Sequence, residues 1–343
     1  MPVDFYRLAN RYHQFGGWRL VWQYTKMRVL WTGVIELAKC VLHGCSFKVA
    51  YPTITKNIDE RLLRQYQYLF DLLEKEDTQN PSSICCGDWS NKQKPKIAWV
   101  IWLQGFDNAP EMVRMCVASQ QKHLTDYEFR FVTEANYHDW LTLPQYLEVK
   151  RQKGRIPDAL FSDLLRTEVL VKYGGLYMDA TVLCTGFNNE RLRTHWTKIE
   201  ESELFLFRYF KRGGLAHIGL SNWFLSVRPY HPVMTAVRDV LFSYWHDYDC
   251  LVDYYIMHLF LDKALSYFPE LLKTMPRGNS FHSIILGDML GRDFNKDVWQ
   301  DLIDHVSFHK LNFRKAIDAA HNPNSYYNNI IMDYHKSLIL KCI

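Results

Sequence analysis

The middle of the chain alternates apolar runs of strand length with longer runs of helix length, and this alternation constrains the fold more than any other feature. Strand, helix, strand, helix, strand in that order predicts a mostly parallel sheet with crossover helices on its faces, which is an α/β fold. The glycine pair Gly174–Gly175 marks the end of the second helix. The predicted elements are a strand over 96–105, a helix over 110–123, a strand over 127–134, a helix over 157–173 and a strand over 176–183.

The same kinds of pattern continue toward the C-terminus. Two helices are expected within 231–268, and further strands over 203–210, 221–227 and 305–311.

The first 58 residues are basic, with eight Lys or Arg against two acids. Apolar residues recur at steps of three and four from Trp18 to Leu42, which predicts one amphipathic helix with Arg19 and Lys26 among the basic residues off its apolar stripe. Two interpretations stay open: the stripe docks on the body of the protein, or it lies in the interface of an anionic membrane. A second helix is expected over 59–76.

Composition excludes several classes of protein. The 343 residues carry a formal net charge of only +4 and no basic run with interleaved aromatic residues, so nucleic-acid binding is not expected. No stretch reaches the roughly 18 apolar residues of a membrane span. Asp4 and Arg7 interrupt any apolar signal peptide, so we expect the eight cysteines to be reduced thiols of a cytoplasmic protein. Cys40, His43 and Cys45 lack a second half at zinc-finger spacing and do not predict a zinc site.

One acid, Asp179, stands near the end of an otherwise apolar strand pattern. Ligands of open α/β sheets bind at the carboxyl ends of the strands, and a buried carboxylate is costly without a partner. We therefore expect Asp179 to lack a protein partner, so that a ligand can dock against it.

Asp163 and Arg166 lie three residues apart on one face of an apolar helix. They either pair with each other and fix the helix, or contact a polar ligand in a cleft.

Several motifs, in a fixed order, resemble one family of enzymes. The stretch GRIPDALFSDLLRTEVLVKYGGLYMDATVLCTG resembles the core motif of the capsular polysaccharide synthesis family of glycosyltransferases, with its Ser-Asp-x-x-Arg helix, Tyr-Gly-Gly turn and acidic triplet. That family is related to other sugar-transferring enzymes with an Asp-X-Asp motif, including bacterial glucosylating toxins. The resemblance covers about residues 96 to 315, and further blocks that match are IWLQGFDNAPEMVRMC, SNWFLSV, LFSYWHDY, DYYIMH and HKLNFRK.

The resemblance implies a domain of the GT-A type that binds a UDP-sugar. By position, Trp102 and Gln104 would flank the nucleotide, Asp163 and Arg166 would contact the sugar or ribose, and Asp179 would be the acid at the diphosphate. Asp163, Arg166 and Asp179 are therefore the implied catalytic residues.

The second acid of the Asp-X-Asp triplet is replaced by Thr181 in this chain. A neutral hydroxyl is a weaker ligand for Mn²⁺ or Mg²⁺ than a carboxylate, so the replacement leaves metal dependence open. His309 resembles the C-terminal histidine that completes the metal site of some GT-A enzymes together with Asp179; the alternative is an ordinary strand histidine. Thr181 and Lys310 would also contact the donor, Lys310 by neutralising phosphate.

The acceptor side is less defined. Asn222 and Trp223 fit a cleft wall that binds a sugar, although Trp223 fits a core position equally well. Asp253 and His258 are candidate bases beside the acceptor, and either could instead be structural. The resemblance implies retention of anomeric configuration, in which the departing phosphate accepts the proton and no enzymic nucleophile is required.

The sequence thus predicts a cytoplasmic, membrane-peripheral glycosyltransferase that moves a hexose or N-acetylhexosamine from a UDP-sugar to a glycan or lipid-linked acceptor in capsular or surface polysaccharide synthesis. Two alternatives stay open: a glycosyltransferase that modifies a protein, and a catalytically inactive glycan-binding or scaffolding subunit. The predicted division of the chain is an N-terminal helical region over 1–80, a linker or surface loop over 81–95, a GT-A domain over 96–315 and a C-terminal helical segment over 316–343.

Overall fold

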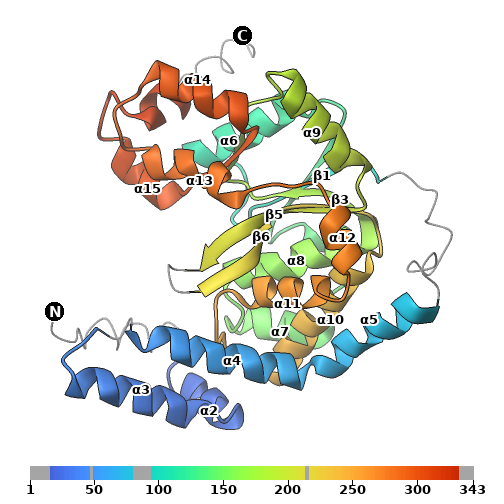
Figure 1. Ribbon diagram of the computed structural model, residues 1–343, viewed down its shortest axis with the longest axis vertical. Helices are drawn as coiled ribbons and strands as arrows, with labels where there is room; N and C mark the ends of the chain where they lie inside the picture. The colour runs from blue at the N-terminus through green and yellow to red at the C-terminus, as the bar shows by residue number, and fades with distance from the viewer. Residues whose placement is uncertain (1–15, 47–48, 80–93, 213–215, 332–343) are drawn as a thin grey trace.

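The computed structural model describes residues 16–46, 49–79, 94–212 and 216–331, and a five-stranded sheet lies at its centre between two helical layers (Figure 1). The first three strands in spatial order are parallel, and the fourth runs antiparallel to both of its neighbours, so four of the five point the same way. The expected α/β class with a mostly parallel sheet is confirmed. In spatial order the strands are β2 (Glu128–Val132), β1 (Ile97–Ile101), β3 (Gly175–Met178), β6 (Ala216–Val227) and β5 (Leu204–Arg212).

The larger core lies on one face of the sheet. Strand residues of one parity, such as Trp99 and Tyr177, bury their side chains there against the helices, as the period of two in a strand requires. This layer consists of α7 (Gln145–Gln152), α8 (Asp158–Tyr173), α10 (Pro232–Asp247) and α11 (Ile256–Leu265).

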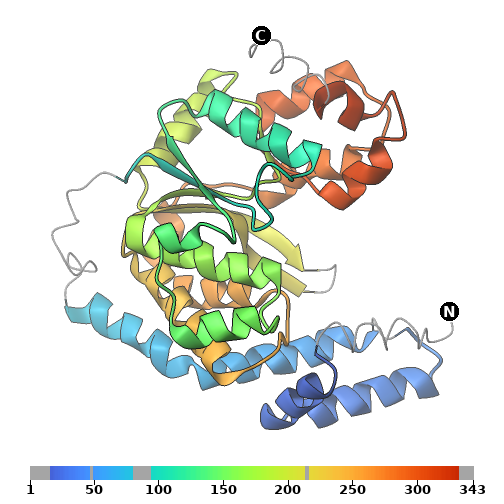
Figure 2. The ribbon, with the colours of Figure 1, turned by 180° about the vertical axis from the view of Figure 1, so that it is seen from behind.

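Strand residues of the other parity, such as Ala98 and Leu176, pack into a smaller, aromatic-rich core on the opposite face, seen from behind in Figure 2. The helices on that side are α6 (Glu111–His123), α9 (Glu190–Glu201), α13 (Ser280–Met289), α14 (Lys296–His305) and α15 (Phe313–Ala319). Shorter elements complete the described chain: the 3-10 turn η2 (Tyr137–Asp139), helix α12 (Pro269–Thr274) and the π-helical turn η3 (Tyr327–Ile331).

The strand expected over 176–183 is in fact two strands in two sheets. The chain leaves the main sheet at Asp179, whose backbone N–H donates to the Trp223 carbonyl at 2.9 Å, and it then turns, with Val182 N–H bonded to the Asp179 carbonyl. Strand β4 (Val182–Cys184) follows and pairs antiparallel with β7 (Phe308–Lys310) in a separate two-stranded sheet. The first strand also ends earlier than expected, at Ile101.

The helix expected from Trp18 to Leu42 is likewise divided. Arg28 has a positive φ of 58°, which an α-helix cannot contain, so α2 (Trp18–Lys26) and α3 (Leu30–Leu42) are separate. The region continues with α4 (Tyr51–Gln65) and α5 (Gln67–Gln79), where one helix over 59–76 was expected.

Helices α4 and α5 pack against the body of the protein. Leu62, Tyr66 and Phe70 are buried in the larger core, and the Tyr66 and Phe70 rings lie 6.2 and 6.3 Å from that of Phe260 in α11. The expected N-terminal helical extension is thus confirmed. Most of the predicted linker over 81–95 lies outside the described residues, and the domain boundaries stay a prediction.

Two findings bear on composition. Among the described residues, no helix is both long and apolar enough to cross a lipid bilayer. The cysteines there are free thiols, namely Cys40, Cys45, Cys116, Cys184 and Cys250.

Candidate active site at the carboxyl edge of the sheet

The glycine pair before β3 sets the position of Asp179. Gly174 and Gly175 have φ values of 66° and 101°, which favour glycine. A Cβ on Gly174 would lie 2.5 Å from Pro229 Cδ, and one on Gly175 would lie 2.5 Å from the Ile97 carbonyl oxygen. The two glycines therefore connect the end of α8 directly to the start of β3 at a place where neighbouring atoms leave no room for a side chain. Asp179 follows at the carboxyl end of that strand.

The Asp179 carboxylate has protein partners on both oxygens. Its Oδ1 accepts a hydrogen bond from the Tyr177 hydroxyl at 2.7 Å and lies 3.5 Å from Arg166 Nη2, and its Oδ2 lies 2.9 Å from Lys310 Nζ. Burial acts to raise the pKa of Asp179, but the Lys310 ammonium and then the Arg166 guanidinium outweigh it, so the pKa is lowered from its ordinary value. The expectation of a carboxylate without protein partners is therefore wrong, although 22% of the side chain is exposed.

Asp163 and Arg166 are joined both to each other and to Asp179. Arg166 Nη2 lies 3.3 Å from Asp163 Oδ1, and Arg166 Nη1 donates to the Asn222 carbonyl at 2.9 Å. The guanidinium also lies 4.4 Å from the centre of the Tyr177 ring. The first interpretation, that the two residues pair with each other, is therefore what the structure shows, and their cation also reaches the acid at the end of the strand. Contact of the pair with a polar ligand stays a prediction.

The two acids of this network titrate differently. Burial raises the pKa of Asp163 to about 7, against the opposing effect of Arg166 and with a further contribution from the Asp179 charge. Near neutral pH the network therefore holds two cations, Lys310 and Arg166, one ionised carboxylate, and a second carboxyl group whose protonated form is favoured by burial. The balance of charge is positive.

Lys310 reaches this network because β7 pairs with β4. Val182 is the register partner of Lys310, and the Lys310 ammonium hydrogen-bonds the Thr181 hydroxyl as well as contacting Asp179. Thr181, at the position of the second acid, therefore serves as a partner for the lysine.

His309 points away from Asp179, which corrects its expected role as a metal ligand. Neighbouring strand residues face opposite ways, and Lys310 takes the side of the acid. His309 is fully buried, with Nε2 3.2 Å from the Thr185 hydroxyl, and burial lowers its pKa to about 4.

The residues at Asp179 do not fit a divalent cation. A metal ion bound to the Asp179 carboxylate would lie beside the Lys310 ammonium, and two cations at one carboxylate repel each other. Within the described ranges, no three His, Cys, Asp or Glu residues gather closely enough to hold a metal ion.

The predicted nucleotide-binding residues follow β1. Trp102 packs partly buried beside the cluster that contains Ala180, its ring is 6.4 Å from that of Phe313, and its buried Nε1 has no hydrogen-bond partner. Gln104 is exposed and donates to Asp158 Oδ2 at 2.8 Å, at the start of α8.

The predicted acceptor residues divide into one at the network and three in the core. Asn222 donates to Asp163 Oδ1 at 3.2 Å. Trp223 is 2% exposed and stacks on Phe207 with ring centres 4.4 Å apart, so it is a core residue and no cleft wall. Asp253 and His258 are buried too, and Asp253 Oδ1 accepts from the Tyr255 backbone N–H.

Two tyrosines of the site were not expected from the sequence. Tyr177 is two residues before Asp179 and shares its side of the strand, a parity signal that could have identified it. Tyr254 belongs to the same electrostatic group, because burial and then the charges of Asp163 and Asp179 raise its pKa. Tyr254 is far from Asp163 and Asp179 in the sequence, so no local pattern could have predicted that it belongs to the site.

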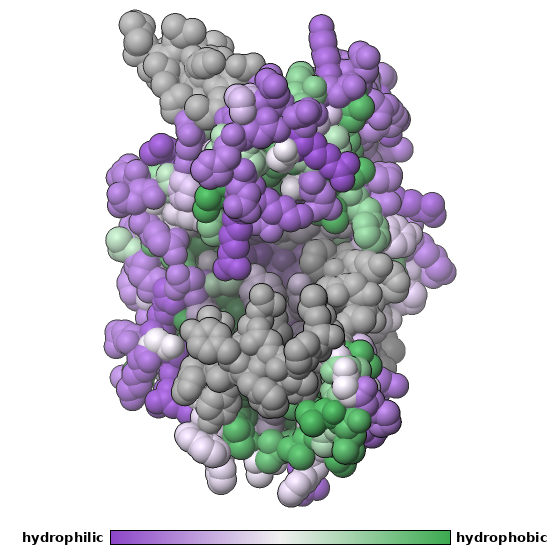
Figure 3. Space-filling model, turned by 90° about the vertical axis from the view of Figure 1, so that its left-hand side faces the viewer, coloured by the Kyte–Doolittle hydropathy of each residue, from purple (hydrophilic) through white to green (hydrophobic). Residues whose placement is uncertain are grey.

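The surface is hollowed on the side to which the strand ends point. In Figure 1, β5 points toward the left, and Figure 3 looks onto that side, where a recess separates the upper helices from the lower part of the molecule. A positively charged network at the carboxyl ends of parallel strands is typical of an α/β enzyme that binds a phosphorylated ligand.

Comparison with known proteins identifies the family. The chain belongs to the capsular polysaccharide synthesis protein family, which matches residues 51–330, a wider range than the expected 96–315. The family expectation is confirmed, and with it the expected class of enzyme, a glycosyltransferase.

Among solved structures the chain is similar to PaToxG Glycosyltransferase, with 13% identity and a TM-score of 0.39 over 62% of this chain and 83% of that one. No curated protein sequence matches the chain.

Proposed function

We propose that this glycosyltransferase transfers a hexose or N-acetylhexosamine from a UDP-sugar to a glycan or lipid-linked acceptor in surface polysaccharide synthesis. The observation that carries the proposal is the pair of cations, Lys310 and Arg166, held on either side of Asp179 at the carboxyl edge of the sheet. A nucleoside diphosphate brings negative charge to this site, where preorganised cations are worth far more than in water.

Lys310 is the proposed electrophilic partner of the donor diphosphate. Its side chain is 25% exposed, so a bound phosphate can reach the ammonium while it stays beside Asp179. The ammonium then stabilises the negative charge that develops as the bond from the anomeric carbon to the phosphate oxygen breaks. Asp179 is 22% exposed, so it can keep its Tyr177 and Lys310 partners and accept from a sugar hydroxyl through its remaining lone pairs.

A retaining mechanism needs no general base beside the acceptor, and the two residues expected as candidate bases are buried. Asp253 and His258 are both about 4% exposed, which leaves neither carboxylate nor imidazole accessible to an acceptor hydroxyl. In the proposed step the acceptor oxygen attacks the anomeric carbon on the face from which the phosphate departs. The phosphate oxygen takes the acceptor proton, and the products are the glycoside and UDP.

The proposed location is the inner, cytoplasmic face of a membrane. Its support is the basic N-terminal helical region, in which four Lys or Arg stand against one acid between residues 16 and 46.

The test is turnover of a panel of UDP-hexoses and UDP-N-acetylhexosamines, with and without EDTA. The proposal expects release of UDP from at least one donor at the same rate in both conditions, and little release by Asp179→Asn. If no donor is turned over under any metal condition, the inactive glycan-binding subunit becomes the better account, since the internal ion pairs of Asp179 would then be purely structural.

A further inference from the structure

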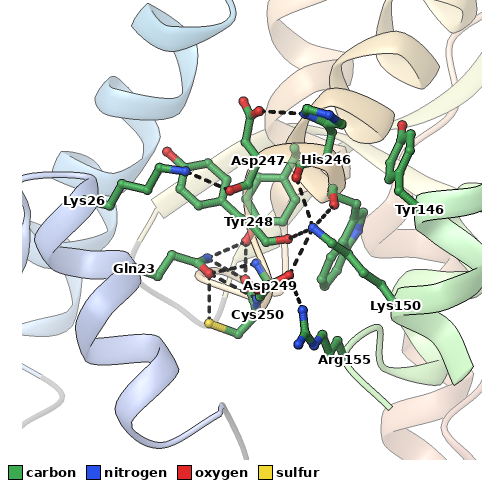
Figure 4. A network of polar contacts seen from close by, with 12 residues as sticks. Gln23, Lys26, Tyr146, Lys150, Arg155, His246, Asp247, Tyr248, Asp249 and Cys250 are labelled. Carbon is green, nitrogen blue, oxygen red and sulfur yellow. Dashed lines mark hydrogen bonds and ion pairs between the residues drawn. The ribbon is translucent and has the colours of Figure 1, made fainter. Parts of the chain in front are cut away.

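Helix α2 attaches to the body through a face that combines apolar and polar contacts: Tyr24 packs against the larger core, and Met27 at the end of the helix is buried in it. Gln23 is the buried residue of α2. Its Nε2 donates to the Cys250 carbonyl and the Tyr244 hydroxyl, and its Oε1 accepts from the backbone N–H groups of Asp249 and Cys250. Figure 4 shows Gln23 beside Asp249 and Cys250. The Cys250 thiol also donates to Oε1 at 2.9 Å, so a single amide fixes the helix with five hydrogen bonds.

The loop that receives α2 is itself held firmly. Asp249 pairs with Lys150 at 3.1 Å and with Arg155 at 2.8 Å, and Lys26 Nζ donates to the Asp247 carbonyl at 3.0 Å (Figure 4). The orientation of α2 is therefore set by several charged and polar contacts.

Helices α2 and α3 also carry large apolar side chains that are exposed to the outside. Trp18, Trp22 and Trp31 are 81, 72 and 73% exposed, and Leu42 at the end of α3 is 83% exposed. Within the described ranges no other tryptophan is exposed to this degree. We call this the α2–α3 surface: Trp18, Trp22, Trp31, Val34, Ile35, Val41 and Leu42. Exposed apolar surface on this scale marks an interaction site.

Basic side chains are interleaved with the apolar ones. Arg19, Lys26 and Arg28 lie in or just after α2, and Lys39 lies in α3, with Glu36 as the one acid between residues 16 and 46. Tryptophan rings at an interface with cations beside them suit the headgroup level of an anionic bilayer.

From these observations we infer that the α2–α3 surface binds the surface of an anionic lipid bilayer. The two helices project from the lower end of the body in Figure 1, and the green patch in Figure 3 lies at the same end. Side chains that protrude with 70 to 80% exposure can insert among lipid headgroups, whereas a protein partner or a second copy would need matching grooves.

This arrangement turns the recess at the strand ends and the α2–α3 surface toward the same side of the molecule (Figure 3). An acceptor anchored in the bilayer would meet the enzyme on that side. The lipid anchor of the acceptor rests on the proposed sugar transfer. The binding to lipid specifies the surface behind the proposed membrane location and does not depend on enzymic activity.

The experiment is co-sedimentation of the full chain with vesicles of phosphatidylcholine alone and with phosphatidylglycerol added. The expected result is binding to the anionic vesicles that weakens with salt. The triple variant Trp22→Ser, Trp31→Ser, Leu42→Ser should bind at least about tenfold more weakly, a change of about 1.4 kcal/mol. Ile317→Ser, 62% exposed on α15 at the far end of the molecule, is the matched control and should bind as the wild type does.

Three results would overturn the inference. In the first, the wild-type chain stays in solution with anionic vesicles at low salt. In the second, the triple variant sediments as well as the wild type does. In the third, the wild-type chain is a dimer that the triple substitution dissociates. The last result would assign the surface to a second copy of the chain. Because the vesicles contain neither donor nor acceptor, failure here is distinguishable from failure of the proposed enzymic function.

Discussion

Replacing Lys310 by methionine removes the charge that we assign to the donor diphosphate and keeps most of the apolar stem. At an effective dielectric constant of about 20, a unit charge about 4 Å from a phosphate oxygen contributes about 4 kcal/mol. Loss of one preorganised donor at a developing charge commonly lowers kcat by about 10² to 10³. We expect a fall in kcat of that size for Lys310→Met.

The fold should survive this substitution. Asp179 keeps its hydrogen bond from Tyr177 at 2.7 Å and its contact with Arg166 at 3.5 Å, and its side chain is partly exposed. The melting temperature should therefore change little, although kcat falls.

The assay is steady-state release of UDP, with Lys315→Met as the control. Lys315 lies five residues further along, with its side chain 54% exposed and paired with Asp288 at 2.5 Å, and its loss should leave turnover unchanged. Wild-type kinetics in Lys310→Met would refute the assignment, as would EDTA inactivation that Mn²⁺ reverses.

Three further predictions concern the network and its turn. Arg166→Ala should destabilise the protein by about 1 to 3 kcal/mol in denaturant unfolding, because it leaves the buried Asp163 carboxyl group and the Asn222 carbonyl without their donor; an unchanged midpoint would contradict this. Since the pKa of Asp163 is raised from 3.8 to about 7, the folded state binds an extra proton between these values, so this residue makes stability fall as pH rises from about 4 to 7. Asp163→Asn should flatten that dependence in unfolding curves measured across the window, and an identical slope would exclude the assignment. Gly175→Ala should lower the melting temperature markedly, since its Cβ would meet the Ile97 carbonyl at 2.5 Å, whereas Gly44→Ala, with open space at the same position, should cost much less.

The order of strands and helices could be predicted because each element depends mainly on the pattern of neighbouring residues in the sequence. Apolar periodicity and the Gly174–Gly175 pair locate α8, β3 and the acid that follows them. The break at Asp179 could not be predicted, because it depends on a backbone hydrogen bond to Trp223, more than 40 residues further along the chain, and on the pairing of β4 with β7.

The partner of Asp179 was predicted only in part. Lys310 and His309 were both expected near it, yet adjacent strand residues face opposite sides, so parity allowed only one of them. The register of β7 on β4 places Lys310, and not His309, on the side of Asp179, and that pairing joins residues about 130 positions apart in the sequence. Trp223 was ambiguous for a similar reason: its burial depends on stacking with Phe207 from the neighbouring strand.

Calorimetric titration in the presence of EDTA tests the central claim most directly, with UDP and uridine as the two ligands. If Lys310 and Arg166 hold the diphosphate, UDP binds without metal, uridine binds at least about a hundredfold more weakly, a difference of about 2.7 kcal/mol, and Lys310→Met removes most of that difference. Equal affinity for the two ligands, or UDP binding only after Mn²⁺ is added, would contradict a lysine-based diphosphate site.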